Sequence, residues 1–103
     1  MTKPVRLLRE ARLELLDAAR WYGDQDVALR QSFLDAVDEA IERARRLAPH
    51  LGIAPGTDPE LRIRRVFVRR FPYSLYFVEL PTHLRVLAFA HARRRPIDWS
   101  QRR

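Results

Sequence analysis

The chain has 103 residues, of which 47% are hydrophobic and 32% charged, with no cysteine and a formal net charge of +7. This length and apolar content predict one domain with one hydrophobic core, and the lack of cysteine excludes disulfide scaffolds, thiol catalysis and sulfur-bound zinc. No apolar run approaches the ~18 residues of a membrane span and we find no signal-peptide pattern, so a cytoplasmic location is expected.

The N-terminal segment predicts a strand followed by a helix. Residues 3–8 are short and apolar, with Pro4 at a position that an edge strand tolerates. Apolar residues then recur at three- and four-residue steps, which predicts an amphipathic helix over about 10–22 that Gly23 can end. The buried stripe of this helix is Ala11, Leu15, Ala18, Ala19 and Tyr22.

A second, longer helix is expected over about 27–48. Asp24 or Asp26 can cap its first turn, and Pro49 ends it. The expected buried stripe is Leu29, Phe33, Val37, Ala40, Ile41, Ala44 and Leu47. Because so few residues separate the two helices, they must fold back as an antiparallel hairpin.

The second half of the sequence changes to a strand-like period. Residues 49–59 are rich in proline and glycine and predict a loop without regular structure. Three runs then alternate or carry β-branched and aromatic side chains, over about 60–70, 73–80 and 84–90. Short turns between them predict an antiparallel meander. The last run is apolar on both parities (Leu84, Val86 and Ala88 on one, Leu87 and Phe89 on the other), as expected for a strand covered on both faces.

These elements predict an α+β fold in the order β-α-α-β-β-β, with an antiparallel sheet packed against the helical hairpin. The expectation is one domain over residues 1–103, ending in a basic tail over about 92–103. Trp21, Tyr22, Phe33, Phe67 and Phe89 are most simply explained as core residues.

Positive charge is concentrated in the second half of the chain. Residues 1–50 hold nine basic and nine acidic residues, whereas residues 51–103 hold eleven arginines and four acidic residues. A neutral half followed by a basic half favours an anionic partner, either nucleic acid or an acidic protein segment. No grouping of histidines and carboxylates has the spacing of metal ligands, and no cofactor is expected.

Two sequence motifs resemble the RelE/ParE superfamily of bacterial toxins, which belong to type II toxin–antitoxin pairs. The first helix carries Ala11-x-x-Glu14-Leu15-x-x-Ala18-x-x-Trp21-Tyr22. The strands and tail carry Ile63-Arg64-Arg65, then Arg70-Phe71-Pro72-Tyr73-Ser74-Leu75-Tyr76, and finally His91-Ala92-Arg93-Arg94-Arg95-Pro96-Ile97-Asp98-Trp99. The resemblance covers almost the whole chain and implies the fold expected above.

The superfamily holds two activities, and the residues favour one of them. RelE-like members cut messenger RNA in the ribosomal A site, whereas ParE-like members poison DNA gyrase and are not known to need catalytic residues. Nuclease members typically carry an arginine on the middle strand, where this chain has Ser74, and the only lysine is Lys3. Because RNA cleavage without a metal needs a base, an acid and cations facing the phosphate, the sequence favours a ParE-like inhibitor over an enzyme.

The resemblance also implies partners and contact residues. An acidic, partly disordered antitoxin would form a hetero-oligomer with the chain, ordering on binding. The antitoxin is expected to contact Val5, Leu7, Leu15, Trp21, Tyr22 and Phe33. The target, gyrase in the favoured interpretation, is expected to contact Arg64, Arg70, Tyr73, His91, Arg93, Arg94 and Trp99.

Two alternatives remain open at this point. The chain can be a RelE-like, ribosome-dependent nuclease, in which His91 is the acid or base and Arg65, Arg69 or Arg93 holds the phosphate. It can also be a non-toxic binding module, such as a decayed toxin. In either interpretation, a basic tail that is simply solvated is as reasonable as one that docks on a partner.

Overall fold

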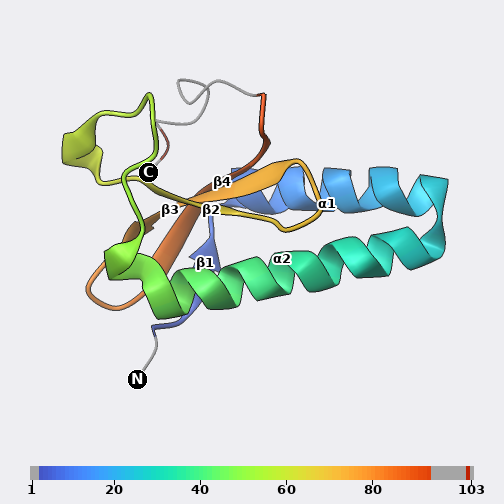
Figure 1. Ribbon diagram of the computed structural model, residues 1–103, viewed down its shortest axis with the longest axis horizontal. Helices are drawn as coiled ribbons and strands as arrows, with labels where there is room; N and C mark the ends of the chain where they lie inside the picture. Colours follow the sequence, from blue (N-terminus) through green and yellow to red (C-terminus); the bar gives the residue numbers. More distant parts are fainter. Residues whose placement is uncertain (1–2, 94–101, 103) are drawn as a thin grey trace.

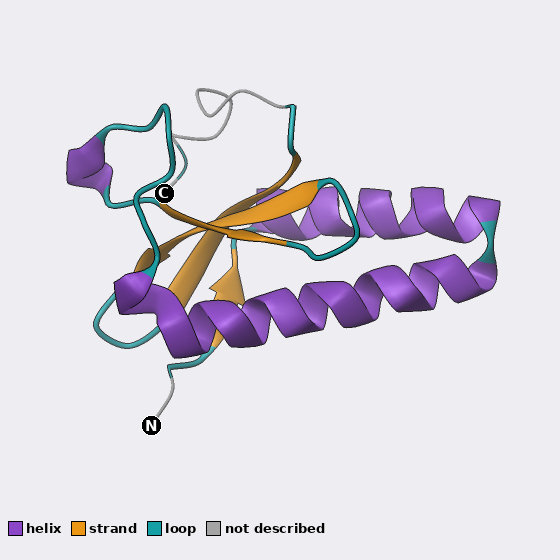
Figure 2. Ribbon diagram, viewed as in Figure 1, coloured by secondary structure: helices purple, strands orange, loops and turns teal. Residues whose placement is uncertain are grey.

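A computed structural model describes residues 3–93 and residue 102, in which two helices lie over one face of a four-stranded sheet (Figures 1 and 2). The elements are β1 (Val5–Leu7), α1 (Arg9–Gln25), α2 (Val27–Leu47), β2 (Arg64–Phe67), β3 (Tyr73–Glu79) and β4 (Leu84–His91), with short 3₁₀ helices at Ala48–His50 and Pro59–Leu61. This confirms the predicted α+β fold class. Among the described residues, no helix has the length and hydrophobicity needed to cross a bilayer.

The sheet has the order β1-β4-β3-β2 and is mixed. Strands β2, β3 and β4 form the predicted antiparallel meander, but β1 pairs in parallel with β4, with Val5 opposite Leu84. The expectation of a wholly antiparallel sheet is therefore wrong at this edge. Parallel strands need a long crossover between them, and here the helical hairpin and the two middle strands together provide it.

The helical hairpin turns more tightly than the sequence predicted. Helix α1 continues through Gly23 to Gln25, so Asp26 alone separates the two helices, and the prediction that Gly23 ends α1 is wrong. A Cβ at Gly23 would lie 3.1 Å from Cδ of Arg30, so the missing side chain lets the helices approach closely. Asp26 caps α2 as predicted, since its Oδ1 accepts a hydrogen bond of 2.8 Å from the N–H of Ala28.

The main core lies between the helices and the sheet. Its largest fully buried side chains include Phe33 and Val37 of α2, Leu75 and Phe77 of β3, and Phe89 of β4. The predicted stripe of α2 holds along most of the helix, but Leu47 is 37% exposed while Ala36 and Ala48 are buried. At Leu47 the α-helix gives way to the 3₁₀ helix, and this change of period turns Ala48 inward instead.

A second, smaller cluster covers the other face of the sheet. Segment 51–63 lies on this face, and its Ala54 and Ile63 pack with Tyr76 and with part of β4. Strand β4 is thus buried on both faces, as predicted. The prediction of which β4 side chains share a face is wrong, because a β-bulge shifts the register with β3 between Tyr76 and Phe77. As a result Leu84, Val86 and Phe89 face the helices, whereas Leu87, Ala88 and Ala90 face segment 51–63.

The arginine-rich run expected as one long strand is regular only over Arg64–Phe67. Arg62 and Arg70 have positive φ angles of 54° and 70°, and these left-handed residues bracket the strand on both sides. The arginines therefore do not alternate along one extended strand, as the sequence suggested.

Two of the expected core aromatics lie at the surface. Trp21 is 57% exposed, since the neighbouring Tyr22 takes the inward position on α1. Phe67 is 55% exposed at the end of β2, opposite the buried Ser74. Tyr22, Phe33 and Phe89 are buried, so the core prediction is confirmed for these three rings and wrong for Trp21 and Phe67.

Candidate functional site

A cluster of aromatic rings forms beneath the ends of β3 and β4. Tyr73 stacks on Phe89 with ring centroids 4.9 Å apart and planes 9° from parallel. Phe33 is fully buried and meets Phe71 and Phe89 edge to face, at 5.2 and 5.6 Å. Such edge-to-face and stacked pairs stabilise beyond the area that they bury. The cluster therefore forms a well-packed base for the surface above these rings.

Above this base an open cleft of about 350 Å³ lies between α1 and the end of the sheet. It is lined by Glu14, Asp17, Ala18, Trp21, Tyr73, Phe89, Ala90 and His91. The cleft brings together Trp21, Tyr73 and His91, which the sequence analysis had assigned to two different contacts. Trp21 projects into it from α1 and packs edge to face on Tyr22, with centroids 5.1 Å apart.

His91 ends β4 directly opposite Tyr73. The two rings meet edge to face at 5.4 Å. The Nδ1 atom of His91 accepts a hydrogen bond of 3.2 Å from the backbone N–H of Arg93. A neutral imidazole whose Nδ1 accepts a hydrogen bond carries its proton on Nε2, and that N–H can donate a hydrogen bond to a ligand.

The tyrosines of the cluster stay neutral near physiological pH. Burial raises the pKa of Tyr22, and the neighbouring Tyr73 raises it further. Burial also raises the pKa of Tyr73. Both phenols therefore keep their O–H group, and that of Tyr73, which lines the cleft, can donate a hydrogen bond to a ligand.

One wall of the cleft is fixed by an ion pair between Glu14 and Arg102. The guanidinium donates to both carboxylate oxygens, at 2.9 and 3.2 Å, and also to the carbonyl of Leu87 at 3.1 Å. Oε1 of Glu14 additionally accepts the backbone N–H of Phe89 at 3.2 Å. Both charged side chains are only 16% exposed. Arg102 is thus held against β4, in contrast to a solvated tail.

Sequence reasoning did not assign Glu14 a role in the site. The one available signal is its position on the inward side of α1, between Ala11 and Ala18, both of which are buried. A carboxylate at such a position requires a polar partner, because an unpaired buried charge is costly. The identity of that partner could not be read locally, since Arg102 lies 88 residues away in the sequence.

The predicted arginine contacts are dispersed. Arg64 donates to the carbonyl of Leu51 and so fixes segment 51–63. Arg69 is paired with Glu39 at 3.7 Å, and Arg65 lies 4.6 Å above the ring of Phe67. Two further predicted target contacts are exposed: Arg70 lies in the β2–β3 turn, and Arg93 lies beside the cleft. The other two, Arg94 and Trp99, lie outside the described residues.

The predicted antitoxin contacts are mostly buried or half-buried. Phe33 is fully buried, Tyr22 is 8% exposed, and Val5, Leu7 and Leu15 pack against the main core, so Trp21 alone is largely exposed. Strand β1 nevertheless forms an edge of the sheet. Pro4 and Leu8 bond to β4, and the alternation of a parallel ladder leaves the backbone groups of Val5 and Leu7 on the outer side.

On β3, Ser74 occupies the position at which nuclease members of the superfamily typically carry an arginine. This serine is 1% exposed, and it lies between Phe67 of β2 and Ala90 of β4. Across residues 3–93 and 102, no group of three or more histidine or acidic side chains is placed to hold a metal ion. The site as a whole offers aromatic faces and hydrogen-bonding edges, which suit the binding of another molecule.

Comparison with solved structures gives a clear match for the fold. The chain is similar to a chain of the chromosomal ParDE TA system from P. aeruginosa, with a TM-score of 0.72 and 15% sequence identity, over 87% of this chain and 96% of that one. No family model matches the sequence, and no curated protein matches it either. At this identity the likeness establishes the fold, and it agrees with the architecture that the motifs implied.

Proposed function

We propose that this protein is the toxin of a type II toxin–antitoxin pair of the ParE kind. It acts in the cytoplasm, inhibits growth by binding DNA gyrase and stabilising its cleaved complex with DNA, and is neutralised by a cognate antitoxin. The observation that carries the proposal is the fold, shared along nearly the full length of both chains with a member of a ParDE system. The net charge of +7 suits an acidic antitoxin segment, because complementary fields speed encounter.

The buried Ser74 supports inhibition by binding over RNA cleavage. A hydroxyl that is 1% exposed can neither balance the charge of a phosphate transition state nor reach a substrate. The only lysine, Lys3, lies at the far end of the sheet from His91 and is paired with Glu79 at 3.3 Å. Among the described residues, therefore, neither a lysine nor a cation on β3 accompanies His91 as the acid, base or phosphate partner of a metal-independent nuclease.

The aromatic cleft gives a direct route to neutralisation. Trp21 belongs to the expected antitoxin surface and His91 to the expected target surface, and both line the same cleft of about 350 Å³. An antitoxin segment that covers Trp21 also covers His91, so antitoxin and gyrase compete for one place. The outer edge of β1 offers the same segment unpaired backbone groups for strand addition.

The experiment is a supercoiling assay with purified gyrase and purified protein. Trp21→Ala and His91→Ala should each raise the concentration needed for inhibition about tenfold, the usual effect of losing a central interface contact. Phe67→Ala is the matched control, because Phe67 is a comparably exposed aromatic (55% against 57% for Trp21) that does not line the cleft. Unimpaired supercoiling at micromolar wild-type protein contradicts the proposal.

A nuclease remains the second candidate, favoured by the exposed imidazole of His91 beside Arg93 at the end of β4. In that case ribosome-bound messenger RNA is cut, and His91→Ala abolishes both cleavage and growth arrest. Toxicity retained in His91→Ala removes this histidine as a catalytic residue. Growth that continues at verified expression levels, with antitoxin binding intact, identifies a non-toxic binding module instead.

A further inference from the structure

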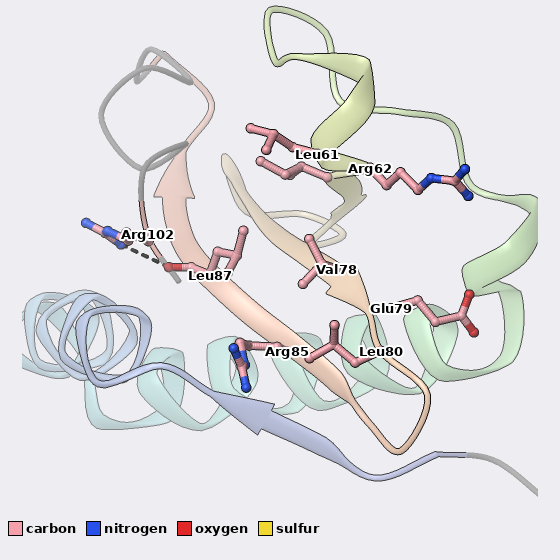
Figure 3. Close-up of a pocket in the computed structure, with 9 residues that line it drawn as sticks. Leu61, Arg62, Val78, Glu79, Leu80, Arg85, Leu87 and Arg102 are labelled. Carbon is pink, nitrogen blue, oxygen red and sulfur yellow. Dashed lines mark hydrogen bonds between the residues drawn. The ribbon is translucent and has the colours of Figure 1, made fainter.

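A second cavity, of about 260 Å³, lies beside the β3–β4 hairpin (Figure 3) and adjoins the aromatic cleft at the Glu14–Arg102 ion pair. It is lined by Leu61, Arg62, Ile63, Val78, Glu79, Leu80, Arg85, Leu87 and Arg102. Four of these residues belong to the smaller apolar cluster between segment 51–63 and the sheet: Leu61, Ile63, Val78 and Leu87. The cavity therefore opens on the face of the sheet that the helices leave uncovered.

The floor of this cavity is aliphatic. Ile63 and Leu87 are only 1% and 3% exposed, and Figure 3 shows Leu61, Val78 and Leu87 around the same space. Its volume falls below the ~300–1,000 Å³ typical of small-molecule pockets, so it fits one or two apolar side chains better than a whole cofactor. Among the described residues that line the cavity none is aromatic, so these side chains offer no platform on which a nucleic-acid base could stack.

The rim of the cavity carries unbalanced positive charge. Glu79 is paired with Lys3 at 3.3 Å, and Arg102 with Glu14 at 2.9 Å. Within the described part of the chain, the guanidinium groups of Arg62 and Arg85 form no ion pair. Figure 3 shows these two arginines on different sides of the aliphatic floor, with their charged ends directed outward.

We infer that this cavity binds an acidic peptide segment, which inserts one apolar side chain while flanking carboxylates pair with Arg62 and Arg85. Charge decides between the possible occupants. A second copy of the chain would bring two basic rims together at a net charge of +7 each, and the arginine-rich run from Arg93 to Arg95 has the same sign as the rim. The inference rests on this cavity alone and does not depend on gyrase being the target.

The test is fluorescence anisotropy with the full chain and a labelled, glutamate-rich peptide that carries one central leucine. The double variant Arg62→Ala/Arg85→Ala should weaken binding about tenfold, because two charge-assisted contacts are lost. The control is Arg12→Ala/Arg20→Ala, which removes the same charge from exposed positions of α1 that do not line the cavity. This control should change the affinity by no more than about twofold, the effect of net charge alone.

The apolar contact is tested with a second peptide in which serine replaces the central leucine. It should bind about fivefold to tenfold more weakly, as expected for losing one partly buried aliphatic side chain. Equal losses in the two double variants, equal binding of the two peptides, or no binding at all would overturn the inference. So would single-stranded DNA that displaces the peptide from this cavity, or self-association of the chain that the Arg62→Ala/Arg85→Ala variant abolishes.

Discussion

The ion pair between Glu14 and Arg102 is expected to hold Arg102 against β4, and its removal should destabilise the fold. Arg102→Ala deletes two hydrogen bonds to the carboxylate and one to the carbonyl of Leu87. The carboxylate of Glu14 then keeps its contact with the N–H of Phe89 but loses the Arg102 guanidinium. The perturbation thus weakens the compensation of a mostly buried charge.

The size of the effect follows from the geometry of the pair. Breaking a fully buried ion pair costs about 3–5 kcal/mol, and exposed pairs contribute about 0–1 kcal/mol. Both side chains here are 16% exposed, which places the pair nearer the buried limit. The entropy cost of ordering Arg102 opposes part of this gain, so Arg102→Ala should lower the free energy of unfolding by about 1–3 kcal/mol. A loss of 2 kcal/mol would lower the Tm by about 8–16 °C.

Urea unfolding followed by circular dichroism measures this loss. A double-mutant cycle with Arg102→Ala, Glu14→Gln and the combined variant isolates the pairwise term, expected to be about 1–2 kcal/mol. Arg12→Ala, exposed on the same helix, serves as the control and should change stability by less than about 0.5 kcal/mol. A coupling indistinguishable from zero, or an Arg102→Ala variant as stable as this control, would refute the assigned anchor.

Three further outcomes are expected for the helical hairpin. Gly23→Ala should raise the free energy of unfolding by about 0.5–1 kcal/mol in thermal or urea unfolding, because alanine has the higher helix propensity. The new Cβ meets only the flexible side chain of Arg30, at 3.1 Å. Destabilisation would show that this contact is rigid. Asp26→Ala should cost about 1 kcal/mol in the same assay by removing the cap of α2, whereas Asp26→Asn should retain most of it. The hydrogen bond from Arg43 lowers the pKa of Glu39 from its ordinary value near 4.5, so the ionised Glu39 stabilises the fold above that pH and this stabilisation is lost as the pH falls below it. A Glu39→Gln variant should therefore lose less stability than wild type between neutral and acid pH. Parallel profiles of stability against pH would contradict this.

The secondary structure could be predicted because local patterns determine it. The three- and four-residue period of the helices, the proline after α2 and the two apolar parities of β4 all correspond to observed features. The parallel pairing of β1 could not be predicted, because its partner β4 is distant in the sequence. The passage of α1 through Gly23 could not be predicted either, because a glycine is compatible with a helix end as well as with a helix interior. The β-bulge opposite Tyr76 and Phe77 left no sequence signal that period counting could detect.

The candidate site was predicted in part, for a related reason. Motif resemblance identified Tyr73, His91 and Trp21, but only the fold shows that they line one cleft. The contacts of the arginines inside the molecule could not be predicted: Arg64, an expected target contact, bonds to the carbonyl of Leu51, and Arg69, a candidate of the nuclease alternative, pairs with Glu39. Sequence counts charges without showing which of them are already neutralised inside the molecule, and tertiary structure supplies that information.

Inhibition by binding, without hydrolysis, is tested most directly by incubating the purified protein with gyrase, ATP and relaxed plasmid, and then denaturing the mixture to release trapped breaks. Supercoiling should fall and linear plasmid should accumulate as the protein concentration rises, and prior addition of the antitoxin should prevent both. Gyrase that remains fully active, together with cleavage of ribosome-bound messenger RNA by the same preparation, would contradict the proposed function.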